Sequence, residues 1–226
     1  MAGCGGSGSN NTTVPTLSGD VVAFSSANAM DIADAVLVAR NNLSIAIAVA
    51  DVTLPTLCSS GGSFEVYSSG TPTVKDGIVK FDNCNFNNDA IINGSFSFHI
   101  RITGALVRRT GFGELSFTNP ADSTSFELVM NFDDKSIPAK GGFKKWANFA
   151  VVDFPQLGSF TTETTIEFEG NFLTAQLNSG ELLIYGGNDS LIRITVIATN
   201  IASVELDDGS GSGFIEIVGS PIPIKP

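Results

Sequence analysis

The chain has 226 residues, of which 42% are hydrophobic and 15% charged, and 17 of them are Phe. This composition excludes a mostly disordered chain, because disordered chains are poor in aromatic residues and rich in charge. Twelve basic against 23 acidic residues give a net charge of −11, so we expect no nucleic-acid partner, since the molecule as a whole repels polyanions.

Residues 1–20 predict a flexible tether with a lipid anchor at its start. Ala2-Gly3-Cys4 resembles the end of a bacterial lipobox, in which the Cys thiol receives diacylglycerol. The Gly-, Ser- and Asn-rich run that follows is too polar to join a core. No apolar signal segment precedes Cys4, and we expect that a signal has been trimmed. The alternative is a Gly- and Ser-rich terminus with an incidental Cys.

These features indicate a protein of the bacterial cell envelope, attached to a membrane through Cys4. Gly5 follows the Cys, where Asp is linked to retention in the inner membrane. We therefore expect an outer-membrane anchor, with the protein facing the periplasm or the cell surface. No run of the chain reaches the roughly 18–20 apolar residues of a transmembrane helix.

Residues 27–40 predict an amphipathic helix, preceded by Ser25 and Ser26 as N-caps. Asn41-Asn42 is expected to end it. Residues 43–54 are apolar and fit either a second helix or a strand. The predicted buried face follows the period of one helix face and contains Met30, Ala33, Val36, Leu37 and Arg40.

Cys58 and Cys84 are the two cysteines left once Cys4 is assigned to the anchor. An even pair in an exported protein predicts a disulfide. Closing this loop stabilises a fold by roughly 3.5 kcal/mol in the chain-entropy model. The alternative is a pair of buried free thiols, as in a cytosolic protein.

From residue 63 onward the pattern is β, because apolar and polar residues alternate with period two. We expect one domain over residues 21–226, mainly β, with about ten to twelve strands. The expected architecture is an antiparallel curved sheet, sandwich or open barrel with one N-terminal helix packed on it. Residues 191–199 are apolar at nearly every position and predict a central strand covered on both faces. Asp133-Asp134 is expected to form a turn.

Six segments of the chain share a recurrent pattern of strand starts, strand ends and turns. They are residues 26–29, 77–84, 92–95, 179–186, 189–196 and 204–209. In this pattern the chain resembles uncharacterised exported lipoproteins of proteobacteria, over most of its length after residue 20 and most specifically at the segment that ends in Asn83-Cys84. The resemblance implies export and a β-rich fold, and it assigns no activity.

Basic residues gather in one part of the chain: residues 101–145 hold seven basic and five acidic residues, whereas residues 146–226 hold two and ten. The simpler interpretation is a solvated face. The functional one is a patch for an anionic ligand, such as a lipid headgroup or a glycan. Trp146 beside Lys144-Lys145 could stack on a sugar or enter a membrane interface. The basic residues are Arg101, Arg108, Arg109, Lys135, Lys140, Lys144 and Lys145.

No catalytic, metal or cofactor site is expected. His99 is the single His, which excludes a His-cluster metal site, and it alternates onto the polar side of its strand. Glu167 and Glu169 share one strand face about 6–7 Å apart, where a glycosidase needs carboxylates facing each other across a cleft. Residues 207–213 resemble a calcium loop, but Gly stands where oxygen ligands are needed, so we expect a hairpin loop.

The sequence therefore predicts a non-enzymatic, lipid-anchored envelope protein with a binding or structural role, and it leaves the ligand-binding residues and the protein or glycan partner unknown. One alternative is a carrier that holds an apolar ligand or lipid between sheet and helix, in line with a mean hydropathy of +0.22. Another is a glycan-active or glycan-binding protein.

Overall fold

The computed structural model describes residues 21–49, 58–86, 90–137, 140–171, 173–217 and 219–224. The predicted tether and Cys4 lie outside these residues. The described part contains one helix, α1 (Ala29–Val49), and the strands β1 (Ser63–Thr71), β2 (Val74–Phe86), β3 (Ala90–Thr103), β4 (Leu106–Thr118), β5 (Ser125–Ile137), β6 (Gly142–Phe154), β7 (Gly158–Asn171), β8 (Gln176–Tyr185), β9 (Leu191–Ala198), β10 (Ile201–Asp207), β11 (Ile215–Glu216) and β12 (Ile222–Pro223).

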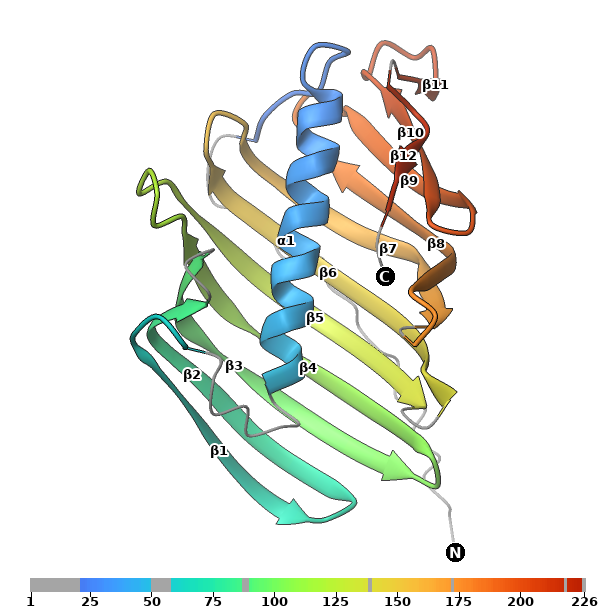
Figure 1. Ribbon diagram of the computed structural model, residues 1–226. Coiled ribbons are helices and arrows are strands. Elements are labelled where there is room, and N and C mark those ends of the chain that lie inside the picture. The colour runs from blue at the N-terminus through green and yellow to red at the C-terminus, as the bar shows by residue number, and fades with distance from the viewer. Residues whose placement is uncertain are drawn as a thin grey trace, which may run out of the picture.

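All twelve strands belong to one antiparallel sheet, and from β1 to β11 each strand pairs with the one before it. The short β12 pairs with β10. The sheet is curved and unclosed, since in the described residues β1 does not pair with the strands at the other end. The predicted mainly β fold with one packed helix is thus confirmed, in its curved-sheet form (Figure 1).

Helix α1 lies across one face of the sheet, and it is longer than predicted. It begins at Ala29. The residue before it, Asn28, accepts a hydrogen bond at its Oδ1 atom from the backbone N–H of Ser25, at 2.8 Å. The prediction that Asn41-Asn42 ends the helix is wrong. Leu43 in the following turn is buried against the sheet, and this burial outweighs the modest helix propensity of Asn.

Small side chains let α1 lie close to the strands. Ala33 and Val36 of the predicted face are fully buried, whereas Met30 and Leu37 are only partly so. The buried stripe is therefore rotated from the predicted one. Its other fully buried members, which the prediction missed, are Ala29, Ile32, Ala39 and Ala46.

The core lies between α1 and the face of the sheet that it covers, which we call the covered face. Aromatic rings fill it, and two glycines of β4 make room for them. A Cβ atom on Gly111 would lie 2.6 Å from the ring of Phe132, and one on Gly113 would lie 2.4 Å from the Cα atom of Phe96. The rings of Phe96 and Phe132 meet edge to face, with centroids 5.9 Å apart.

Strand β9 corrects one prediction. It was expected to be covered on both faces, but only one face is buried, and the side chain of Ile197 on the other is 58% exposed. Its apolar outer residues therefore do not indicate a second covering layer. We call the face of the sheet turned away from α1 the open face, because no described element packs on it.

No helix in the described residues is both long enough and apolar enough to cross a membrane.

Candidate functional site

Three pairs of adjacent charged residues divide between the two faces of the sheet. Successive side chains of a strand point to opposite faces, so one member of each pair reaches the open face and its neighbour the covered face. The open-face members are Arg108, Asp133 and Lys144, and the covered-face members are Arg109, Asp134 and Lys145.

The predicted turn at Asp133-Asp134 is wrong, since both residues lie inside β5. Each of them pairs with an arginine of the neighbouring strand β4. Asp133 accepts two hydrogen bonds from Arg108, at 2.9 Å from Nε and 2.7 Å from Nη2. Asp134 lies 4.0 Å from Nη1 of Arg109 on the other face. Because each carboxylate pairs with an arginine on its own face of the sheet, the two adjacent aspartates are accommodated within a continuous strand.

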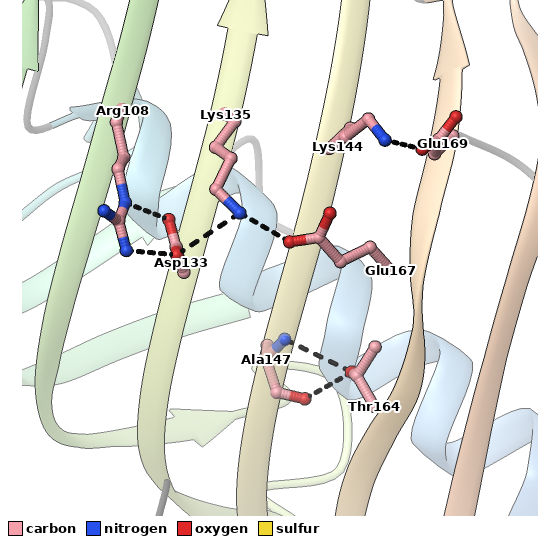
Figure 2. A network of polar contacts seen from close by, with 8 residues as sticks. All are labelled: Arg108, Asp133, Lys135, Lys144, Ala147, Thr164, Glu167 and Glu169. Atoms are coloured by element: carbon pink, nitrogen blue, oxygen red, sulfur yellow. Dashed lines mark hydrogen bonds and ion pairs between the residues drawn. The ribbon is translucent and has the colours of Figure 1, made fainter. Parts of the chain in front are cut away.

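On the open face, one connected network joins Arg108, Asp133, Lys135 and Glu167, and a separate ion pair lies beside it (Figure 2). Lys135 lies 3.6 Å from Asp133 and 2.5 Å from Oε1 of Glu167, and Lys144 pairs with Glu169. The hydrogen bond to Asp133 raises the pKa of Arg108, and that to Glu167 raises the pKa of Lys135. Glu167 and Glu169 are thus occupied by lysines of neighbouring strands.

Four cations of the open face stand in one cross-strand row. Arg101 of β3 is directly opposite Arg108, Arg108 is opposite Lys135, and Lys135 is opposite Lys144. We call these four residues the cation row. The two-residue turn at Gly104-Ala105 sets the first of these pairings, so the turn position was the signal in the sequence that could have found it.

Beside the cation row the open face is hollowed. A hollow of about 540 Å³ is lined by side chains from β3 to β7, among them Arg101, Thr110, Asn131 and Trp146. A second hollow, of about 520 Å³, lies further along the same face and is bordered by Phe112, which is 66% exposed. Sequence reasoning pointed to Trp146 and the basic residues but missed Thr110, Asn131 and Phe112.

The covered face also has a charged cluster, formed by Arg40 of α1 with Arg109, Asp134 and Lys145. The guanidinium of Arg40 lies over the ring of Phe168, 3.9 Å from its centroid, and burial lowers its pKa to about 10. Burial also lowers the pKa of Lys145 and raises that of Asp134, an effect that Arg109 opposes. Oδ1 of Asp134 has no hydrogen-bond partner among the described residues.

The space enclosed between this cluster and the helix is about 20 Å³ among the described residues. The apolar-ligand carrier, which needs a cavity between sheet and helix, stays a prediction. Native mass spectrometry of the purified protein would test it, because a co-purified lipid would add a defined mass.

His99 lies where the sequence predicted, on the open face among polar groups. Its Nδ1 atom is 2.7 Å from Oδ1 of Asp76 on β2, and 44% of its side chain is exposed. Residues 207–213 connect β10 to β11, where Asp207 and Asp208 accept hydrogen bonds from the backbone N–H groups of Gly209 and Ser210. In the described residues no three His, Cys, Asp or Glu side chains form a group that could hold a metal ion.

The predicted disulfide between Cys58 and Cys84 is confirmed. Two of the segments that resemble exported lipoproteins meet beside it. Asn83, which has a positive φ of 47°, donates its backbone N–H to Oδ1 of Asn93 at 2.7 Å, where the pairing of β2 and β3 shifts. The Asn-Cys segment therefore holds a bulge and the disulfide, which is a structural role.

Comparison of the chain with protein-family models, with curated proteins and with solved structures finds no match.

Proposed function

We propose that this protein is a non-enzymatic, lipid-anchored protein of the bacterial cell envelope that binds a ligand on the open face of its sheet. Cys4 attaches it to the membrane, and the tether of residues 1–20, in which Cys4 lies, gives the β domain its reach. A flexible polar tether leaves the open face free to meet a ligand at a distance from the anchor.

The observation that supports binding is the shape and chemistry of the open face. Its two hollows, about 520 and 540 Å³, fall in the range of roughly 300–1,000 Å³ typical of ligand sites. Trp146 and Phe112 offer ring surface there, and the ion pairs of Asp133 hold Arg108 and Lys135 in place. The 20 Å³ space under the helix offers far less room.

The partners of the candidate acids and bases support a non-enzymatic role. Glu167 and Glu169 are each paired with a lysine, and His99 contacts Asp76 at the protein surface. A general base needs a perturbed environment and a reacting group within hydrogen-bond reach. Surface ion pairs are instead typical of side chains that stabilise or position one another.

Lipid labelling tests the anchor. The native precursor and its Cys4→Ser variant are expressed in cells fed a palmitate analogue. We expect label on the wild type and none on the variant. Equal labelling of both would exclude Cys4 as the anchor.

Cysteine footprinting tests the open face without knowledge of the ligand. Thr110→Cys places a thiol in the larger hollow, and Ser210→Cys places one in the exposed loop before β11. We expect maleimide to label Cys at position 110 more slowly in intact envelopes than in purified protein, and position 210 equally in both. Equal rates at position 110 would contradict binding on this face.

A further inference from the structure

We propose that the cation row binds an acidic polysaccharide whose carboxylated sugars lie across strands β3 to β6. This inference rests on the proposed function and names the ligand of the same face. It follows from the register of the four cations, from their charge balance and from the ring surface beside them.

The register places the cations at a regular interval. Arg101, Arg108, Lys135 and Lys144 are directly opposed residues of adjacent strands, so their side chains share one face. Adjacent strands lie about 4.8 Å apart, and the repeat of one sugar in an extended pyranose chain is similar to that spacing. A chain with one carboxylate on each sugar can therefore present one negative charge to each cation.

The charge balance leaves the row able to accept an anion. Arg101 stands directly opposite Arg108, and like charges in that position destabilise a sheet. The side chain of Arg101 makes no hydrogen bond or ion pair with any described residue. A carboxylate between the two guanidinium groups would relieve their repulsion, and Arg suits such two-pronged contacts.

The other three cations are held in place by protein carboxylates. Arg108 and Lys135 share Asp133, and Lys144 pairs with Glu169. The first two pairs are partly buried and the third is exposed. Ion pairs that water can reach are weak, so they orient the cations without outcompeting a ligand that binds several at once. The row with Asp133, Glu167 and Glu169 keeps one net positive charge, as four cations face three carboxylates, on a chain of net charge −11.

The hollow beside the row suits sugar rings. Trp146 supplies an aromatic surface on which the apolar face of a sugar can pack, and Thr110 and Asn131 supply hydrogen-bonding groups for hydroxyls. Cation, indole and amide thus lie within one hollow of about 540 Å³.

Charge density favours a polysaccharide over a nucleic acid. Double-stranded DNA has one negative charge per roughly 1.7 Å of its axis, far denser than a row spaced at strand intervals. The excess phosphates would meet an acidic protein and be repelled. A polyuronate has one charge on each sugar, which matches the row.

Trp146 makes the test direct, because it is the single Trp of the chain and lines the hollow. Polygalacturonate is titrated into the purified full chain while the Trp fluorescence is followed, with neutral dextran as the parallel probe. We expect a saturable change with polygalacturonate that weakens as salt rises, and none with dextran.

Paired variants test the row itself. The double variant Arg101→Gln with Lys144→Gln removes both ends of the row, and we expect its affinity for polygalacturonate to fall about tenfold or more, as the loss of charged hydrogen bonds predicts.

Lys75→Gln is the control, since Lys75 is exposed on β2 and points to the opposite face. The control should change affinity less than about twofold. Thermal melts show whether each variant folds, and Arg101→Gln alone, which breaks no ion pair of a described residue, replaces the double variant if that fails to fold.

Three outcomes would overturn the inference. They are equal affinity of the wild type and the row variant for polygalacturonate, equal binding of dextran, and tighter binding of phosphatidylglycerol vesicles or of DNA than of polygalacturonate. The footprint at Thr110→Cys separates the two proposals. Protection in envelopes without polygalacturonate binding would refute the polysaccharide and keep the open face as a binding surface, and no protection would refute both.

Discussion

The two faces of the sheet have the same kinds of charged residue one position apart in the chain, and they differ in access to water. On the open face, Asp133 accepts two short hydrogen bonds from a half-exposed Arg108. On the covered face, Asp134 lies among cations that α1 shields from water. Burial there lowers the pKa of Lys145 and raises that of Asp134, so it favours the neutral form of each group. Identical chemistry thus gives a positioned, solvated network on one side and a cost of desolvation on the other.

The largest difference between the faces is expected in the loss of unfolding free energy when an aromatic residue is replaced by Ala. Phe96→Ala opens a cavity in the covered core and should cost about 3–5 kcal/mol of unfolding free energy. Phe112→Ala removes a ring that is 66% exposed on the open face and should change it by less than about 0.5 kcal/mol. Denaturant unfolding of both variants measures the contrast, and similar costs would mean that the open face is covered.

Replacing each of two neighbouring lysines, Lys145 and Lys144, by Met should change the stability of the fold in different ways. Lys145→Met replaces a buried ammonium, which Arg40 and Arg109 repel, by an apolar side chain of similar length. Because Arg109 stays beside Asp134, we expect the relief of desolvation and repulsion to stabilise the fold by about 1 kcal/mol. Lys144→Met removes an exposed ion pair with Glu169 and should change stability by at most about 0.5 kcal/mol. Urea midpoints report both effects. A marked loss of stability in Lys145→Met would show that its charge is required by Asp134.

The pH dependence of the melting temperature should show the raised pKa of Asp134 in the folded protein. Burial raises its folded-state pKa above the unfolded value of about 3.9, so its contribution favours folding below that pH and is lost as the pH rises through the folded pKa. Melting temperatures of the wild type should therefore fall relative to those of Asp134→Asn as the pH rises through the acidic range. A constant difference between the two proteins at all pH values would contradict the shift.

The smallest effect is expected at His99 on the open face. His99→Gln removes a surface contact with Asp76 and should alter the unfolding free energy by less than about 0.5 kcal/mol. Thermal unfolding measures this, with the wild type at the same pH as reference. Loss of any activity found later, with the fold intact, would give His99 a chemical role and contradict the non-enzymatic proposal.

The sequence predicted the features that depend on local periodicity or on counting. Period-two alternation indicated an antiparallel β fold but left a curved sheet, a sandwich and an open barrel as alternatives. The early small-residue helix was recognised, and the two remaining cysteines gave the disulfide. These signals are strong because alternation and cysteine pairing restrict the chain wherever it folds.

Features decided by tertiary contacts were not predictable in the same way. The helix continues past Asn41-Asn42 because Leu43 is buried by strands that follow later in the chain. Asp133-Asp134 forms no turn because β4 offers an arginine on each face. The cation row depends on the register of three successive hairpins, and a shift of one residue in any of them would send its side chains to the other face.

The strand order has a consequence for how the chain reaches its native state. Because each strand from β1 to β11 pairs with its predecessor, the sheet can grow hairpin by hairpin as the polypeptide emerges, with contacts that are close in sequence. Helix α1 is made before every strand, yet it packs against β6, β9 and β10. Most of the stability of a helix in a protein comes from packing of its apolar face, so α1 depends on these strands. Among the described elements, the first in chain order therefore completes its docking only after nearly the last strand has formed, and until then part of the apolar side of the growing sheet is open to aggregation.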